Sequence, residues 1–506
     1  MSANALRQVV IVGGGTAGWM AAAGLARVFG SLLDITLVES EEIGTVGVGE
    51  ATIPQIQLYN RLLGIDEDAF VRATRGSFKL GIVFDGWGAP GERYIHAFGE
   101  PGTPLGGLPF HHYWLRDRLA RGERGAPDLW AYSLNAEAAF AGRFGRSPTG
   151  GFGPLGEMPY AFHFDAHLYA KFLRAYAERL GVKRIEGKVL DVTLGEPDGR
   201  VVSLRLDHDR ELHGELFVDC SGFRGLLIEQ ALRTGYEDWS NHLPADRAVA
   251  VPCARVEPLT PWTKATADAA GWRWRIPLQH RTGNGYVFCS RFISEDEATA
   301  RLLSQLDGEA LGDPRPLRFV TGKRRRIWNR NVVALGLASG FMEPLESTSI
   351  HLVQSCLDKL IQYFPDRDFA DAPRDRFNAE ADAEYVAIRD FLVLHYTATR
   401  RDDTPFWRHC RDALPQPETL KARMELWRRA GRLPVESHDL FKPNSWLQVL
   451  VGQGIEAEGY SPLANRLEAA RLSMWLADVR GLVARAREQL PDHAAFITAS
   501  CRAEAA

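Results

Sequence analysis

One short segment combines a carboxylate with hydroxyl side chains at the start of a predicted helix. Glu346 precedes Ser347, Thr348 and Ser349, and the apolar stretch from Ile350 onward is typical of a long helix. The first N–H groups of a helix have no intrahelical partner, and the helix dipole is positive at that end. The pattern therefore predicts a site for a small anion beside a carboxylate. Glutamate is also common at helix starts for purely structural reasons.

A lysine lies in a second segment that could take part in chemistry. Phe78, Leu80, Ile82 and Phe84 alternate with other residues, which predicts one strand with these four side chains on one face. Lys79 then lies on the opposite face. Lysine is rarely fully buried, so the position alone favours a solvated side chain without a chemical role.

The chain begins with a pattern typical of a nucleotide-binding turn. A β-branched apolar run at 8–12 leads directly into a GxGxxG sequence, and a helix is predicted over 19–28. The spacing assigns the tight turn to Gly13, close approach of a pyrophosphate to Gly15, and close helix–strand packing to Gly18. These features together predict a bound dinucleotide.

A second strand is predicted over 34–38, and it ends in Glu39, whose carboxylate can accept hydrogen bonds from a ribose. A glycine-punctuated loop over 43–54 follows, where a regular βα alternation would place another helix. Further strands are predicted at 182–194, 201–206, 216–219 and 331–335. This order predicts an α/β (α+β) protein with an FAD-binding, Rossmann-like fold of the flavin-monooxygenase type and an additional β-sheet.

The composition is that of a globular protein and argues against some classes of function. Hydrophobic residues make up 45% and charged residues 25% of the 506 residues, as in globular proteins. A net charge of −4 gives no basic surface for nucleic acid.

The six cysteines include no CxxC pair, which argues against a zinc site and fits a reducing cytoplasm. We find no signal peptide and no apolar run of the roughly 18 residues that span a bilayer. His111 and His112 adjoin, but spacing places no further ligand, so we predict no metal.

Motifs along nearly the whole chain match one family of enzymes. They are GGGTAGWMAA at 13–22, GVGEATIP at 47–54, SFKLGIVFDGW at 77–87, FHHYWLR at 110–116, FHFDAHL at 162–168, VDCSGFRGLLI at 218–228, GWRWRIPL at 271–278, GLASGFMEPLEST at 336–348 and TRRDDTPFW at 399–407. With these motifs the chain resembles the flavin-dependent tryptophan halogenases. The tryptophan-x-tryptophan-x-isoleucine-proline motif, which includes Trp272 and Trp274, distinguishes that family from general flavin hydroxylases and implies a position near the flavin.

The resemblance changes the interpretation of the two chemical segments. It implies that Lys79 and Glu346 are catalytic. Lys79 would hold an electrophilic halogen, either by hydrogen bonding hypohalous acid or as a haloamine. Glu346 would polarise the hypohalous acid or accept the proton that the ring loses. Thr348 and Ser349 match the halide-binding positions, chiefly through backbone N–H groups. Ser349 replaces a glycine that is typical of the family, so the preference for chloride or bromide stays open.

The resemblance also implies the contacts to FAD and to the substrate. The implied FAD contacts are Gly13, Gly15, Thr16, Ala17, Gly18, Glu39, Ala51, Val189, Leu337 and Ile350. His96 and Phe98 match residues that sandwich an indole ring, although a strand-edge histidine and a core phenylalanine are the ordinary alternative.

The C-terminal part predicts a helical substrate-binding subdomain. Helical periodicity covers 420–432 and 463–489. We therefore divide the chain into an FAD-binding module at 1–364, with substrate-side segments interleaved at about 77–160, and a mainly helical subdomain at 365–506. Ser445 and Trp446 stand where free-tryptophan halogenases carry a tyrosine pair that clamps the charged end of the amino acid. We therefore predict that Trp446 contacts the substrate, and that indole or an indole derivative is preferred over free tryptophan.

The sequence therefore predicts an FADH2-dependent halogenase that uses O2 and chloride or bromide to form hypohalous acid and halogenate an electron-rich aromatic ring. No second nucleotide-binding turn is visible, so a separate NAD(P)H-dependent flavin reductase is the expected partner. We expect neither nucleic acid nor a membrane as partner, and a homodimer stays open. Two alternatives remain: a flavin-dependent aromatic hydroxylase, and a non-catalytic flavin-binding protein.

Overall fold

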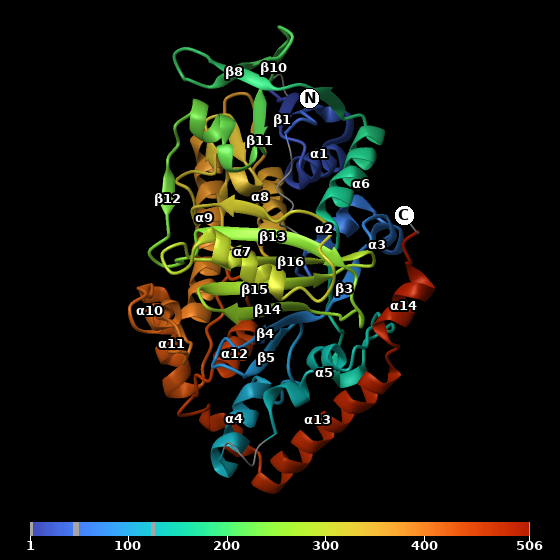
Figure 1. Ribbon diagram of the computed structural model, residues 1–506, viewed down its shortest axis with the longest axis vertical. Helices are drawn as coiled ribbons and strands as arrows, with labels where there is room; N and C mark the ends of the chain where they lie inside the picture. The colour runs from blue at the N-terminus through green and yellow to red at the C-terminus, as the bar shows by residue number, and fades with distance from the viewer. Residues whose placement is uncertain (1–3, 44–49, 123–126, 505–506) are drawn as a thin grey trace.

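The computed structural model describes residues 4–43, 50–122 and 127–504. A mostly parallel sheet forms the upper part of the molecule in Figure 1. The edge strand β19 is antiparallel to its neighbour, and the other pairs are parallel. In spatial order the strands are β19 (Trp328–Asn329), β20 (Val332–Ala334), β11 (Leu216–Asp219), β1 (Gln8–Val12), β2 (Asp34–Glu39) and β7 (Lys183–Glu186).

The predicted nucleotide-binding unit is confirmed. β1 and β2 have the expected bounds, and α1 (Thr16–Phe29) begins at Thr16 because Gly15 takes the cap position. Helices α6 (Ala166–Arg179) and α8 (Ser349–Gln362) pack against α1. The stretch predicted at 182–194 forms two strands, since β7 joins this sheet and β8 (Val189–Leu194) leaves it for a small antiparallel sheet with β9 (Val201–Leu206) and β10 (Glu211–His213).

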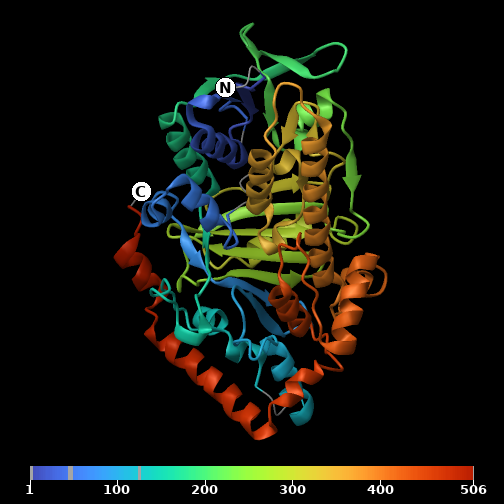
Figure 2. The same cartoon turned by 180° about the vertical axis from the view of Figure 1, so that it is seen from behind.

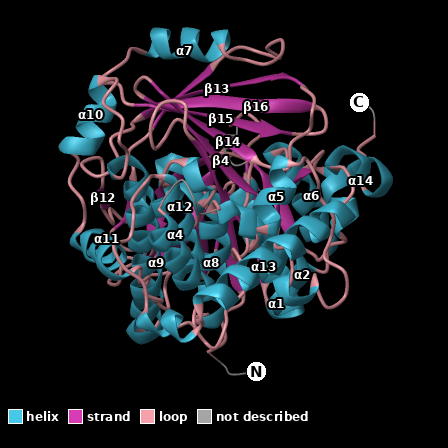
Figure 3. Ribbon diagram, turned by 90° about the horizontal axis from the view of Figure 1, so that it is seen from below, coloured by secondary structure: helices cyan, strands magenta, loops and turns pink. Residues whose placement is uncertain are grey.

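The predicted additional sheet lies in the middle of the molecule and is mostly antiparallel. Its strands, in spatial order, are β17 (Arg315–Arg318), β13 (Arg247–Ala254), β16 (Arg281–Phe288), β15 (Gly271–Pro277), β14 (Thr263–Asp268), β4 (Gly81–Asp85) and β5 (Arg93–Ala97). Figure 3 shows α7 (Glu295–Ser304) on one face of this sheet and most other helices on the opposite face. β12 (Tyr236–Asp238), β18 (Gly322–Arg324) and β21 (Gly340–Phe341) form a smaller sheet beside it.

The prediction of one continuous strand at 78–84 is wrong. The chain breaks at Leu80, where β3 (Ser77–Lys79) ends and β4 begins. β3 pairs with β6 (Ala161–His163), whereas β4 pairs with β5 and β14. Leu80 bonds instead to two loops, because its N–H donates to Pro261 O at 2.8 Å and its carbonyl accepts from Phe98 N–H at 2.8 Å. The break places Lys79 at the junction of two sheets, where both faces are covered.

Helices dominate the C-terminal part of the described chain. The long α9 runs down the back of the molecule beside α8, as Figure 2 shows. The predicted helix at 463–489 is divided, because η8 (Pro462–Arg466) is a 3₁₀ turn that starts at a proline and precedes α13. The helices are α9 (Asp371–Thr397), α10 (Pro405–Asp412), α11 (Glu418–Ala430), α12 (Pro443–Gly452), α13 (Ala469–Gln489) and α14 (His493–Ser500).

Several C-terminal helices contact elements from the first third of the chain. α12 packs on β5, and α13 packs on α4 (Phe110–Arg121) and α5 (Leu134–Phe140). α2 (Ile56–Leu63) and α3 (Glu67–Ala73) lie nearer α1, α8 and α6. The division at residue 364 stays a prediction. Across the described ranges, no helix combines the length and the apolar character needed to cross a bilayer.

Candidate active site

Lys79 is fully buried, so the solvated-lysine interpretation is wrong. Its Nζ donates to Thr52 O at 3.0 Å and to Ser347 Oγ at 2.8 Å, and it lies 5.6 Å from the centre of the Phe98 ring. Burial lowers the pKa of Lys79 from 10.5 to about 7, although the negative charge of Glu346 opposes this effect. Both the ammonium and the neutral amine are therefore accessible near neutral pH.

Ser347 is a site residue that the sequence did not identify. It follows the 3₁₀ turn η7 (Pro344–Glu346) and adopts a left-handed conformation with φ of +59°. Such a conformation is uncommon for a residue other than glycine and needs support from the surroundings. Here it turns the buried serine hydroxyl toward Lys79. The run of hydroxyl residues was visible in the sequence, but nothing in it indicated this backbone conformation.

Glu346 lies between two histidines from different elements. His96 Nδ1, on β5, is 2.9 Å from Glu346 Oε2, and His395 Nε2, on α9, is 2.8 Å from Oε1. Burial by itself would raise the pKa of Glu346, but the charges and hydrogen bonds of the two histidines outweigh burial and lower that pKa to about 2. Glu346 is thus a carboxylate at neutral pH. No sequence pattern indicated His395, which lies 49 positions away from Glu346 in the chain.

A small cavity of about 20 Å³ lies at the start of α8. Its volume is sufficient for about one small occupant. Thr348 occupies the cap position without a side-chain hydrogen bond, and its buried Oγ1 has no partner in the described structure. The first N–H groups of α8 have no intrahelical partner. The cavity lining is Ala51, Thr263, Trp272, Trp274, Ile276, Pro344, Ser347 and Ser349. The structure therefore brings the paired tryptophans, Ala51 and the predicted halide position Ser349 together.

The two tryptophans of the motif are held by different contacts. Trp272 Nε1 donates to Glu343 Oε2 at 3.3 Å, and Tyr396 donates to the same oxygen at 2.8 Å. Burial raises the pKa of Glu343 to about 7. Trp274 lies over Gly285 of the neighbouring strand, where an added Cβ would come within 2.0 Å of the indole ring. The glycine thus makes room for this wall of the cavity.

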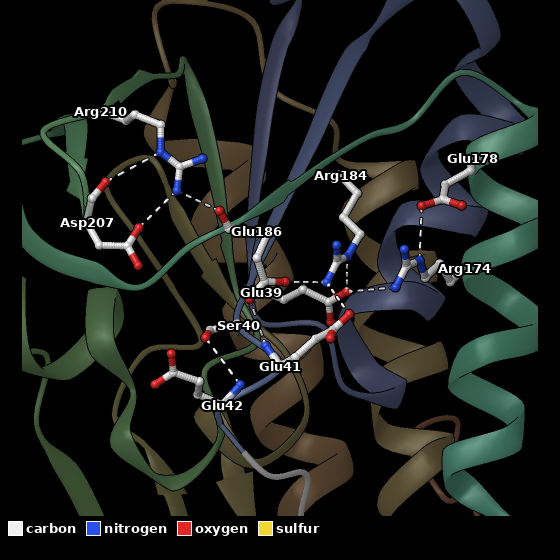
Figure 4. A network of polar contacts seen from close by, with 10 residues as sticks. All are labelled: Glu39, Ser40, Glu41, Glu42, Arg174, Glu178, Arg184, Glu186, Asp207 and Arg210. Atoms are coloured by element: carbon white, nitrogen blue, oxygen red, sulfur yellow. Dashed lines mark hydrogen bonds and ion pairs between the residues drawn. The ribbon is translucent and has the colours of Figure 1, made fainter.

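The end of β2 provides the predicted ribose-binding carboxylate. Figure 4 shows Glu39 beside Arg184, whose Nε donates to Glu39 Oε1 at 2.6 Å. Arg174 is 3.8 Å from the same oxygen. The other oxygen, Oε2, lies over Gly14, where a Cβ would approach it to 1.3 Å. Glu39 therefore has one oxygen fixed by arginine and the other directed over the glycine turn.

The glycine turn leaves no space for side chains. A Cβ at Gly13 would come within 2.3 Å of Cys220 O, and one at Gly18 within 1.8 Å of Gly13 O. Gly13 also has φ of +110°. Ala17 lies next to Gly336, at the start of the turn η6 (Gly336–Ala338) that contains Leu337. The glycine turn, which includes Gly15 and Thr16, therefore lies close to Leu337 of η6 through its neighbour Ala17.

The remaining predicted FAD contacts lie farther apart. Ile350 is in the first turn of α8, and Ala51 forms an isolated bridge with His163 and lines the cavity. Val189 begins β8, where it pairs with Leu206 and packs against the apolar cluster that includes Val12 of β1 and Val38 of β2. Residues 44–49 of the predicted glycine-punctuated loop, which include the first three of the 47–54 motif, lie outside the described residues.

The predicted substrate residues do not form one continuous surface. His96 contacts Glu346, and Phe98 lies beside Lys79. Trp446 is on α12, and its Nε1 donates to Phe441 O at 3.1 Å. The Phe391 ring lies between them, with its centre 5.7 Å from that of His96 and 5.0 Å from that of Trp446. Trp446 is therefore one aromatic ring removed from His96, the histidine that contacts the carboxylate.

The adjacent histidines at 111 and 112 have structural partners. His111 donates to Gly431 O at 2.9 Å, and His112 Nδ1 accepts from Ser461 N–H at 3.2 Å. Over the ranges that the structure describes, no group of three or more histidine, cysteine or acidic side chains is placed to hold a metal ion.

Comparison with known proteins identifies the family. The tryptophan halogenase family model matches residues 8–469. This chain belongs to the tryptophan halogenase family. It is 36% identical to the 7-chloro-L-tryptophan 6-halogenase KtzR of Kutzneria sp. (strain 744), over 97% of this chain and 98% of that protein. It is 37% identical to the tryptophan 7-halogenase RebH of Lentzea aerocolonigenes, over 92% and 93% of the two chains.

Solved structures of flavin-dependent halogenases share the whole fold. One from Xanthomonas campestris has 48% identity and a TM-score of 0.95, and covers 99% of this chain and 100% of its own. BrvH from Brevundimonas sp. BAL3 has 44% identity and a TM-score of 0.93, over 98% and 99% of the two chains. The chain is therefore a flavin-dependent halogenase, an oxidoreductase, with the predicted fold class.

The residues at the nucleotide turn fit the flavin that the family requires. Gly13 and Gly18 keep the turn tight, and Glu39 Oε2 lies over Gly14 at the position of a ribose acceptor. When bound, FADH2 would supply the electrons that activate O2. Enzymes of this type generally rely on a separate flavin reductase.

Replacing Gly14 with alanine should weaken FAD binding. The new Cβ would displace the Glu39 carboxylate, and loss of one hydrogen bond to a charged group costs about 1.5–3 kcal/mol. We therefore expect the Kd for FAD to rise about tenfold or more in a fluorescence titration. Gly312→Ala is the matched control, because nothing lies within 4 Å of its added Cβ. Equal FAD affinity for Gly14→Ala and wild type would contradict the placement of Glu39.

The low pKa of Lys79 predicts a pH-dependent stability. Between pH 7 and 10.5 the unfolded chain carries a proton on Lys79 that the folded chain lacks, so stability rises with pH in this window. From pH 7 to 9 we expect a rise of about 2–3 kcal/mol from this group. Urea unfolding of Lys79→Met should lack this rise. Lys264→Met is the control, because Lys264 is partly exposed and paired with Asp85; the same slope in Lys79→Met and wild type would refute the prediction.

Proposed function

We propose that this halogenase uses chloride or bromide to modify an uncharged, electron-rich indole ring, with Lys79 and Glu346 as its catalytic residues. The position of Lys79 carries this proposal. Its amine is bound to Thr52, the chain neighbour of the cavity-lining Ala51, and to Ser347, which lines the cavity itself. Lys79 thereby connects the cavity to Glu346 and Phe98 on the other side of the site.

The cavity is the proposed halide site. Thr348 and Ser349 lie at the positive end of the α8 dipole, and the unpartnered Thr348 hydroxyl can donate to an anion. Trp272 and Trp274 cover the cavity with apolar surface, which limits the access of water to the halide. Halide oxidised with the help of the bound flavin would reach Lys79 past Ser347.

Lys79 then presents the electrophilic halogen to the ring. As a neutral amine it donates two hydrogen bonds, to Thr52 O and Ser347 Oγ, and keeps a lone pair that can take the halogen. As an ammonium it keeps a third N–H that can bind hypohalous acid. Either form fixes the halogen at one position, so the orientation of the ring selects the carbon that reacts.

The surroundings of Trp446 support an uncharged substrate. Arg423 lies over the Trp446 ring, and its guanidinium is bound to the buried Asp439. Asn444 donates to Gly99 O at 2.5 Å, so it too is already bonded. An amino acid that enters here would bring a carboxylate and an ammonium into a site whose nearby polar groups are occupied. Burying unpaired charges is costly, which disfavours free tryptophan.

Loss of the Lys79 amine should abolish halogenation. For Lys79→Ala supplied with FADH2, O2, bromide and indole, we expect brominated product to fall about 10²-fold or more, while FAD affinity stays within twofold of wild type. Mass spectrometry identifies product by its halogen isotope pattern, and an added oxygen would instead indicate a hydroxylase. Lys264→Ala is the control, since that lysine is partly exposed on β14. Wild-type product yield from Lys79→Ala would refute the assignment.

Indole should be a better substrate than free tryptophan. We expect kcat/KM for indole to exceed that for tryptophan about tenfold or more, since tenfold corresponds to about 1.4 kcal/mol and an unpaired buried charge costs at least this much. Steady-state assays with saturating FADH2 and bromide measure the ratio. Equal or faster turnover of tryptophan would show that the amino acid's charges find partners in the site.

The supply of reduced flavin is the remaining proposal about partners. We expect a NAD(P)H-dependent flavin reductase to deliver FADH2, because the described chain uses its GxGxxG turn for FAD. A homodimer and a cytoplasmic location stay predictions.

A further inference from the structure

Two fully buried histidines share the same contact at one ring nitrogen. His395 Nδ1 lies 2.8 Å from Phe391 O on α9, and His493 Nδ1 lies 2.8 Å from Leu259 O. A carbonyl oxygen can only accept a hydrogen bond, so Nδ1 carries the proton in both rings. The protonation of each histidine therefore depends on what faces its Nε2.

The two rings differ at Nε2. His493 Nε2 is 3.2 Å from Phe78 N, a donor, so this nitrogen accepts and the ring is neutral. Burial, which lowers the pKa of His493 to about 4, agrees with that state. His395 Nε2 instead lies 2.8 Å from Glu346 Oε1, without the alignment of an in-line hydrogen bond. Two lone pairs at this distance repel each other unless a proton lies between them.

We propose that Glu346 and His395 share one extra proton, so that the pair carries one proton more than a carboxylate beside a neutral histidine. During halogen transfer, His395 gives up this proton through Glu346 and then takes it back. His395 is thus a positioning residue that acts through Glu346. The kinetic part of the inference rests on the proposed function. The proton count rests only on the contacts of the two side chains.

His96 does not need the extra proton. One N–H at His96 Nδ1 satisfies its contact with Glu346 Oε2 at 2.9 Å, so neutral His96 is sufficient. A carboxylic acid is a stronger acid than an imidazolium, so the proton of the pair resides on His395 and Glu346 is the carboxylate. Lys79 on β3 and Tyr94 on β5 are the other titratable groups near the pair that interact with Glu346.

The walls around His395 favour a stable pair. Its ring faces Phe84, Trp87 and Phe391, with centres 4.9, 6.1 and 5.1 Å away. These aromatic surfaces exclude water, which strengthens the attraction between imidazolium and carboxylate. Aromatic faces also attract a cation. Removing either charge would leave the other buried alone, which is costly.

The reaction balances with this proton. The ring's π electrons attack the halogen of hypohalous acid, the carbon–halogen bond forms, and the oxygen–halogen bond breaks with its electron pair on oxygen. The leaving hydroxide takes the proton of the pair and becomes water. The C–H bond of the cationic ring then breaks, its electrons restore aromaticity, and Glu346 returns the proton to His395. When Lys79 carries the halogen, its nitrogen takes the proton in place of hydroxide.

Nitrogen-15 NMR of histidine-labelled holoenzyme tests the proton count directly. At pH 8 we expect His395 to have protons on both ring nitrogens, and His493 to have a bare Nε2. The two signals are assigned by their loss in His395→Asn and His493→Asn. A bare Nε2 in His395 would overturn the inference. This measurement uses the resting protein, so it decides the inference even if the proposed substrate is wrong.

Transient kinetics test the use of the proton. For His395→Asn we expect single-turnover bromination of indole to fall about 10²-fold, with KM for indole within twofold of wild type. Hypohalous acid trapped by an added thioether should increase, because halide oxidation continues without transfer.

His493→Asn is the matched control. It removes an equally buried histidine, and we expect no increase in trapped hypohalous acid. If His395→Asn lowers trapped hypohalous acid and raises the KM for indole together, His395 has a merely structural role and the inference fails.

Discussion

The burial of one amine determines the arrangement of this active site. Lys79 Nζ joins the carbonyl of Thr52 to the hydroxyl of Ser347, so segments from three distant parts of the chain meet at one atom. A buried lysine is tolerated only with such partners. The break at Leu80 and the left-handed Ser347 are the backbone features that allow this meeting. Both place a polar atom where an ordinary strand or turn would not.

The pKa of Glu346 is lowered by a different cause from that of Lys79. Burial lowers the pKa of Lys79, whereas His96 and His395 lower that of Glu346 despite burial. The lysine is thereby close to neutral while the carboxylate stays ionised. Groups whose pKa values are moved in this way are typical of catalytic sites. The two histidines come from β5 and α9, so the state of Glu346 depends on how the central sheet packs on the C-terminal helices.

The tryptophan wall depends on equally specific packing. Trp272 is held by Glu343, to which Tyr396 also donates, and Trp274 fits over Gly285. The two rings close a cavity at the start of α8. The neighbouring Trp87 and Trp407 are also fully buried, with ring centres 5.4 Å apart. A rigid aromatic support of this kind would keep the proposed halide site separate from the proposed substrate ring.

The sequence by itself determined the family, the fold class and the nucleotide turn. Strands 8–12 and 34–39, the glycines and Glu39 depend on short-range patterns, and these appeared where expected. The family motifs in the sequence also singled out Lys79, Glu346 and Thr348. Periodicity failed at 78–84, because the change of partner at Leu80 depends on β6 and β14, which lie far away in sequence.

Only the tertiary structure decided what the site residues contact. Lys79 is buried rather than solvated because loops from both sides cover it. Ser347 became a site residue only because the chain after η7 meets Lys79 on β3, and His395 only because α9 meets Glu346 of η7. Trp446 proved to be one ring removed from His96, because Phe391 of α9 lies between them. Such contacts join residues that are tens to hundreds of positions apart, and local sequence patterns hold no information about distances across the folded core.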